Sequence, residues 1–310
     1  MLIKYLESSA TGDDVDLSCL EELGELVCLN VETEEEMRES VCDADVIIVN
    51  KLKVNEQTVG HAEKLKLVCE AATGIDNIDV AYLKQRGIEW RNVAGYSTDA
   101  VAQHTFAMAF YLEESLAYYD QYVKSGAYIQ NPTFTHFAKG FHELAGKTWG
   151  IIGLGAIGRK VATIAQAFGC RVVYYSASGQ KAQDGYEQVD FDTLLKESDY
   201  LSIHAPLNEY TVHLMDQSAF GKMKKSAILI NVGRGPIVDQ QALYDALVNG
   251  EIRAAALDVL EKEPMQVDNP LFRIKDSEKL LITPHMAWAG VEARNRLIRT
   301  IADHIRTVLR

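Results

Sequence analysis

One stretch of sequence decides the fold: residues 146–159 read GKTWGIIGLGAIGR. Its glycines at Gly153, Gly155 and Gly158 follow a short apolar run and precede residues with helical periodicity, which predicts a strand, a tight turn and a helix. In such a turn the first glycine permits a positive φ, the second lets a phosphate approach the backbone, and the third lets the helix pack on the strand. The stretch therefore predicts a dinucleotide-binding unit, with the pyrophosphate at the helix N-terminus.

The end of the next predicted strand, residues 171–175, bears on which dinucleotide fits. A carboxylate usually stands there and binds the ribose hydroxyls of NAD, but this chain has Ser176. Ser176 can bond a hydroxyl without repelling a 2′-phosphate, and Lys181 is near enough in sequence to attract one, although a solvated loop lysine is the commoner case. NAD(H) is therefore the expected cofactor, and NADP(H) remains open. The alternative is a βαβ unit that binds no ligand.

Composition narrows the class of protein. The 310 residues are 47% hydrophobic, enough for two domains with separate cores. A formal net charge of −13 argues against non-specific binding to nucleic acid or to an anionic membrane. The five cysteines form no C-x-x-C pair, and no targeting segment or apolar run of membrane-spanning length stands out. We expect free thiols, no metal and a cytoplasmic protein.

Strand and helix signals alternate over the first hundred residues and again after residue 146, which is typical of parallel sheets covered by helices. A single long helix is expected over residues 97–123, followed by an irregular arm. The expected fold class is α/β, with two Rossmann-like domains and the active site in the cleft between them. Residues 1–97 with 286–310 would form a flavodoxin-like substrate-binding domain, and residues 98–285 the dinucleotide-binding domain.

Three further segments stand at the ends of predicted strands, where open α/β sheets bind their ligands. They read NVGRG at 231–235, LDVLEKEP at 257–264 and TPHMAW at 283–288. Together they supply the groups that reduction of a 2-oxo acid requires.

The guanidinium of Arg234 could bind the substrate carboxylate and polarise the adjacent carbonyl. The imidazole of His285 could donate the proton, and Glu263 could favour its charged form and orient it. Each residue alone is more often a surface charge, a loop residue or a helix cap. Their occurrence together, downstream of a dinucleotide turn, favours catalysis.

At this point the chain resembles the D-isomer-specific 2-hydroxyacid dehydrogenases, nearly from end to end. The resemblance is carried by ATGIDNID at 72–79, YSTDAVA at 96–102, the glycine turn and the three segments above. It implies that Arg234, Glu263 and His285 are catalytic. It also implies a homodimer whose interface is formed by the nucleotide domain.

The same resemblance implies the ligand contacts. The backbone around Thr73 and Gly74 would bind the substrate carboxylate, with Thr73 near the nicotinamide. Further cofactor contacts are implied for Gly153, Gly155, Ala156, Ile157, Gly158, Ser176, His204, Ala205, Pro206, Val232, Gly233 and Asp258.

Within the family, HMAWA at 285–289 resembles the branch of glycerate dehydrogenases and hydroxypyruvate reductases. A bulky Trp288 would favour a small substrate side chain. Asn50 and Lys51, at a strand end, could contact the substrate or belong to an ordinary loop. Because the sequence stops at Arg310, we expect no C-terminal regulatory domain, which disfavours an allosterically regulated phosphoglycerate dehydrogenase.

The expected function is NAD(P)-dependent reduction of hydroxypyruvate, glyoxylate or a similar small 2-oxo acid to a D-2-hydroxy acid. One alternative is an NAD(H)-sensing or corepressor-like binding module without turnover. Another is an enzyme that keeps NAD bound and recycles it, which lacks an obvious extra catalytic lysine in the motifs.

Overall fold

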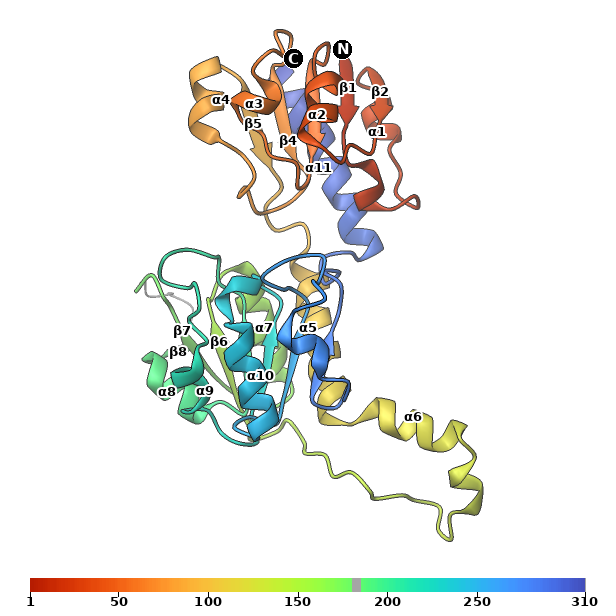
Figure 1. Cartoon of the computed structure of the whole chain (residues 1–310), viewed down its shortest axis with the longest axis vertical. Coiled ribbons are helices and arrows are strands. Elements are labelled where there is room, and N and C mark those ends of the chain that lie inside the picture. The colour runs from red at the N-terminus through yellow and green to blue at the C-terminus, as the bar shows by residue number, and fades with distance from the viewer. Residues whose placement is uncertain (180–184, 310) are drawn as a thin grey trace. The chain divides into compact units, whose positions relative to one another are not determined.

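A computed structural model describes residues 1–179 and 185–309 (Figure 1). The chain divides into two compact units, Met1–Ser97 with Trp288–Arg310 and Thr98–Ala287, called here the first and second unit. Each contains one parallel sheet flanked by helices, which confirms the expected α/β class. Met286 and Ala287 fall in the second unit, two residues beyond the expected boundary, because their backbone N–H groups donate to Asp258.

The first unit is built on a five-stranded sheet in the order β2-β1-β3-β4-β5. Its strands are β1 (Leu2–Tyr5), β2 (Glu25–Cys28), β3 (Val46–Val49), β4 (Leu67–Glu70) and β5 (Glu89–Asn92). Its helices are α1 (Ser18–Glu21), α2 (Glu34–Ser40), α3 (Glu56–Val59), α4 (Val80–Arg86) and α11 (Val291–Leu309), with a 3₁₀ turn η1 (Ser8–Thr11). Strands β3 and β4 are buried throughout, as central parallel strands covered on both faces are.

The order of strands in this sheet reverses beside β1, with β2 on one side and β3 on the other. Open α/β sheets bind ligands outside the carboxyl ends of the strands at such a reversal. The turns after β1, β3 and β4 are therefore the part of the first unit suited to a ligand.

The second unit has a seven-stranded parallel sheet in the order β12-β11-β10-β9-β6-β7-β8. Its strands are β6 (Thr148–Ile152), β7 (Arg171–Tyr175), β8 (Glu187–Gln188), β9 (Tyr200–Ile203), β10 (Ile228–Asn231), β11 (Ala254–Leu257) and β12 (Leu280–Ile282). Its helices are α5 (Thr98–Glu113), α6 (Leu116–Lys124), α7 (Ala156–Ala167), α8 (Phe191–Glu197), α9 (Gln217–Phe220) and α10 (Gln240–Asn249), with 3₁₀ turns η2 (Ala127–Gln130), η3 (Gly235–Ile237) and η4 (Pro270–Arg273). The reversal here lies between β6 and β9, next to the glycine turn.

The prediction of one helix over 97–123 is wrong, because the chain breaks between α5 and α6. Ser115 has a left-handed φ of 49°, which a continuing α-helix does not allow. The buried carboxylate of Glu113 accepts from Arg253 at 2.6 Å and from the backbone N–H of His142 at 2.7 Å. These bonds tie both ends of residues 114–142, the arm, to the body of the second unit, and the arm extends from that body (Figure 1).

Helix α11 belongs to the first unit and buries Leu297, Ile298, Ile301 and Ile305 there. At its start, Arg294 forms an ion pair with Asp14. Among the described residues, no helix combines the length and the apolar character that crossing a bilayer requires.

Candidate active site

The glycine turn after β6 is shaped by the absence of side chains. Gly153 has a φ of 90°, and a Cβ there would lie 2.7 Å from the backbone of Ala205, so another residue would be strained and would clash. A Cβ on Gly158 would overlap the Gly153 carbonyl, which explains how closely α7 approaches the strand. Gly155, the N-cap of α7, brings no capping side chain, and the position of its absent Cβ is open. The N–H groups of the first helical turn therefore suit an anion such as a pyrophosphate.

At the end of β7, the hydroxyl of Ser176 lies 3.2 Å from that of Ser178. The Ser176 side chain carries no negative charge and would not itself repel a phosphate. Lys181, the other residue considered for cofactor choice, lies outside the described residues.

Three predicted cofactor contacts, His204, Ala205 and Pro206, follow β9, and they differ in how far they are buried. The His204 imidazole Nε2 lies 3.0 Å from the Ser202 hydroxyl, and burial lowers the His204 pKa to about 3, so the ring stays neutral. Ala205 packs under Gly153, and the Pro206 carbonyl accepts from Thr211. Because the His204 imidazole is bonded to Ser202 in the interior, this segment can offer a ligand its backbone groups but not the imidazole.

The turn after β10 presents Arg234. Asn231 fixes the turn, since its side chain donates to the Arg234 carbonyl and accepts from the Gly233 N–H, both at 3.0 Å. A Cβ on Gly235 would overlap the Leu260 carbonyl, so glycine alone allows this turn to pack against the segment that follows β11. The guanidinium of Arg234 is thereby held on a rigid turn, beside the segment that carries Glu263.

Glu263 and His285 are in direct contact. The His285 Nδ1 lies 2.6 Å from Glu263 Oε2, and Glu263 Oε1 accepts from the Leu260 N–H at 2.8 Å. With both carboxylate oxygens of Glu263 engaged, the contact with Nδ1 fixes the orientation of the His285 ring. His285 also has a left-handed φ of 52°, a strained conformation for a residue other than glycine or asparagine.

The buried carboxylate of Asp258 holds the backbone that carries His285. It accepts from the Thr283 hydroxyl at 2.6 Å and from the N–H groups of Met286 and Ala287 at 2.9 and 2.8 Å. The Asp258 carbonyl accepts the His285 N–H at 2.8 Å. These bonds stabilise the strained conformation of His285. Sequence reasoning placed Asp258 along the cofactor and did not identify this role.

His104, on α5, completes this group and was also missed. Its Nε2 lies 3.1 Å from the Thr283 hydroxyl and 3.7 Å from Asp258 Oδ1. In the sequence, Thr283 and Asp258 each follow a predicted strand, which was the one indication that their side chains could be hydrogen-bonded to each other. No pattern near His104 indicated that it joins them.

The remaining predicted residues lie in the first unit. Thr73 is braced from both sides, because its hydroxyl donates to the Val93 carbonyl at 3.0 Å and its carbonyl accepts from the Asn92 side chain at 2.7 Å. Gly74 continues this loop after β4. Trp288 meets Tyr96 edge to face, with 6.2 Å between the ring centroids.

The carboxylate of Glu7 holds the turn after β3. Glu7 accepts from the N–H groups of Asn50 at 2.5 Å, Lys51 at 2.9 Å and Leu52 at 3.2 Å. The Asn50 side chain donates to the Ala71 carbonyl, so it joins this turn to the loop after β4. The structure thus brings Asn50 together with the Thr73 loop in the first unit, and Glu263 together with His285 in the second. Arg234 lies on the turn whose Gly235 packs against Leu260.

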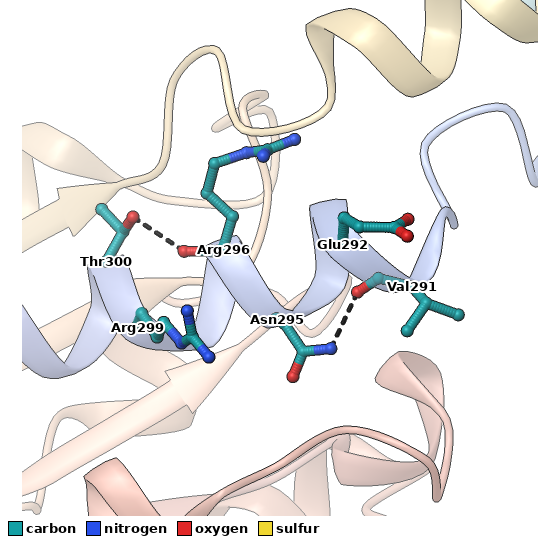
Figure 2. Close-up of a pocket in the computed structure, with 6 residues that line it drawn as sticks. All are labelled: Val291, Glu292, Asn295, Arg296, Arg299 and Thr300. Carbon is teal, nitrogen blue, oxygen red and sulfur yellow. Dashed lines mark hydrogen bonds between the residues drawn. The ribbon is translucent and has the colours of Figure 1, made fainter.

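One hollow of about 450 Å³ lies along α11, lined by Val291, Glu292, Asn295, Arg296, Arg299 and Thr300 (Figure 2). Arg296 and Arg299 point to different sides of the helix in Figure 2. None of the residues predicted for catalysis lines this hollow.

A helix N-terminus that begins at glycine, beside the reversal of a parallel sheet, is the arrangement by which α/β proteins bind dinucleotides. Residues 106–287 match the family model "D-isomer specific 2-hydroxyacid dehydrogenase, NAD binding domain". The chain belongs to the D-isomer-specific 2-hydroxyacid dehydrogenases, as the resemblance in sequence implied.

Individual relatives agree with this assignment. The chain is 36% identical to a glycerate dehydrogenase of Methylorubrum extorquens over 273 residues, covering 88% of this chain and 85% of that one. It is 33% identical to a hydroxypyruvate reductase of Blautia hydrogenotrophica over 302 residues, covering 96% and 93%. The solved structure of an acyclic imino acid reductase with NADPH and D-Arg superposes with a TM-score of 0.86 at 30% identity, covering 100% and 97%. The chain is therefore an NAD-dependent dehydrogenase of this family.

Proposed function

We propose that the chain reduces a small 2-oxo acid, such as hydroxypyruvate or glyoxylate, to the D-2-hydroxy acid. The observation that carries this proposal is the 2.6 Å contact between His285 and Glu263, on a segment locked by Asp258. Relatives named glycerate dehydrogenase, hydroxypyruvate reductase and glyoxylate reductase support the substrate class.

The bound nicotinamide supplies the hydride. His285 donates the proton to the carbonyl oxygen, while Glu263 holds the ring and provides a counter-charge on the Nδ1 side. Arg234 binds the substrate carboxylate and polarises the carbonyl, because its planar guanidinium can bond both oxygens.

The first unit would select the substrate. In this proposal the backbone of Thr73 and Gly74 binds the carboxylate, and Asn50, Lys51 and Trp288 restrict the substrate to a small side chain. The second unit would hold the cofactor at the glycine turn, at Ser176 and at the turns after β9 and β10. Ser176 would permit NADP(H) alongside NAD(H).

We also propose a homodimer in the cytoplasm. The arm exposes Phe134 and Phe137 almost completely, at 88% each, and Ile129 at 80%. Large apolar groups exposed together on a projecting segment mark an interaction surface, and a second copy of this chain would cover them. All five cysteines are free thiols, which fits a reducing compartment.

The test is a set of initial rates with NADH and NADPH separately against hydroxypyruvate, glyoxylate, pyruvate and branched 2-oxo acids. We expect turnover with hydroxypyruvate or glyoxylate, and a fall in kcat of about 10²–10⁴-fold for His285→Ala with unchanged NADH affinity. Tight NADH binding without turnover of any acid would favour the binding module instead, and a near-normal rate for His285→Ala would refute the mechanism.

A further inference from the structure

The carboxyl group of Glu70 is buried without a salt bridge. It is the last residue of β4, its solvent exposure is 0%, and Oε2 accepts from the Asn77 side-chain amide at 2.9 Å. Oε1 has no hydrogen-bond partner in the described part of the chain. A carboxyl group with one bond in the protein interior is expensive to retain, so its position calls for a reason.

The amide of Asn77 gives that reason, because it makes two bonds. Its Nδ2 donates to Glu70 and also to the Leu52 carbonyl, again at 2.9 Å. The Asn77 carbonyl accepts from the Val54 N–H at 2.8 Å. Asn77 thereby joins the turn after β3 to the far end of the loop after β4. Without the oxygen of Glu70, the amide would lose one of its two acceptors.

We propose that Glu70 is a positioning residue for the substrate: its buried carboxyl group fixes Asn77, which holds the 71–77 loop in the shape that binds a carboxylate. The proposal rests on the function assigned above to Thr73 and Gly74. It adds a residue that touches neither substrate nor cofactor and acts on the affinity for the 2-oxo acid alone.

The protonation of Glu70 gives this role a measurable signature. Burial raises the Glu70 pKa to about 8; the Asn77 bond lowers it, and the charge of Glu7 raises it further. Lys51 from the turn after β3 lowers the pKa, and Asp76 from the loop itself raises it. The carboxyl group is therefore neutral at pH 7. Above pH 8 it carries a charge whose desolvation outweighs the stronger Asn77 bond, which disfavours the buried position of Glu70 and with it the arrangement of the 71–77 loop.

Two readouts follow, and neither needs turnover. Wild type should bind oxamate, a non-reducible isostere of pyruvate, to its NADH complex about tenfold more weakly at pH 9 than at pH 7. Glu70→Gln keeps an oxygen for Asn77 and cannot ionise, so this loss should become several-fold smaller, by the part that Glu70 contributes. The neutral carboxyl group stabilises the fold below pH 4.5, and that contribution is lost as pH rises to about 8. The unfolding midpoint of Glu70→Gln should therefore rise relative to wild type between pH 5 and pH 8 and stay level above.

Asn77→Ala and Glu63→Gln complete the experiment. Asn77→Ala should raise KM for the 2-oxo acid at every pH with kcat little changed, while Glu63→Gln, an exposed carboxylate, should behave as wild type. An unchanged alkaline loss of oxamate affinity in Glu70→Gln would overturn the proposal. A thermal difference without any difference in oxamate affinity would also overturn it, leaving Glu70 a purely structural group. Failure of wild type to reduce any 2-oxo acid would refute the proposed function, while the oxamate and unfolding data still decide the role of Glu70.

Discussion

The hydroxyl of Thr283 donates to the buried carboxylate of Asp258 at 2.6 Å, two residues before His285. Thr283→Val removes this bond at constant shape, and Asp258→Asn removes the charge that three donors share. We expect both variants to keep the fold and to lose about 10–100-fold in kcat, because a small displacement of the proton donor is costly. Steady-state kinetics with NADH and circular dichroism would measure this. Thr300→Val, on the surface of α11, is the matched control; loss of kcat there too would contradict the explanation.

Two glycines of the turn after β6, Gly153 and Gly155, should respond differently to substitution. Gly153→Ala meets the Ala205 backbone at a φ of 90° and should cost about 1–3 kcal/mol of unfolding free energy. Gly155→Val enters open space, so stability should change by less than about 0.5 kcal/mol. Its side chain would occupy the approach of the pyrophosphate, and NADH affinity should fall by roughly tenfold or more. Denaturant unfolding and fluorescence titration separate the two effects. Unchanged NADH binding in Gly155→Val would show that the dinucleotide binds elsewhere.

Ser176 allows a direct test of cofactor choice. Ser176→Asp places a negative charge at the end of β7, where it would bond the ribose hydroxyls of NADH and repel the extra phosphate of NADPH. We expect kcat/KM with NADPH to fall about 10–100-fold relative to NADH. Ser176→Ala removes the hydroxyl without adding charge and should not change that ratio strongly. Equal ratios for the two variants would mean that this position does not face the adenine ribose.

The arm gives a prediction about assembly. Phe134→Asp with Phe137→Asp should convert a dimer to a monomer in light-scattering measurements, because two charges would be buried on association. Val267→Asp is the control, since Val267 is equally exposed at 88% but lies outside the arm. A monomeric wild type, or a dimer that survives both arm substitutions, would contradict the proposal.

The sequence predicts local features well and tertiary ones poorly. The glycine turn and the strand over residues 171–175 follow from patterns within ten residues, and the structure has both at the predicted positions. The end of α5 does not follow from local patterns, because it depends on the ion pair between Glu113 and Arg253, a residue 140 positions away. Likewise Asp258 reads as a strand-end carboxylate in sequence, and its bonds to the segment of His285 appear only when β11 and β12 pair. Glu70 ends a strand like any solvated glutamate, and nothing in the sequence shows that it is buried.

The position of Glu7 at the turn after β3 also affects which anions this turn can bind. Three consecutive N–H groups after β3 would form a receptor for a phosphate or a second carboxylate, but the chain fills it with a side chain of its own. Glu7 is an internal competitor for these N–H groups, tethered and always present, so the turn is unresponsive to free anions.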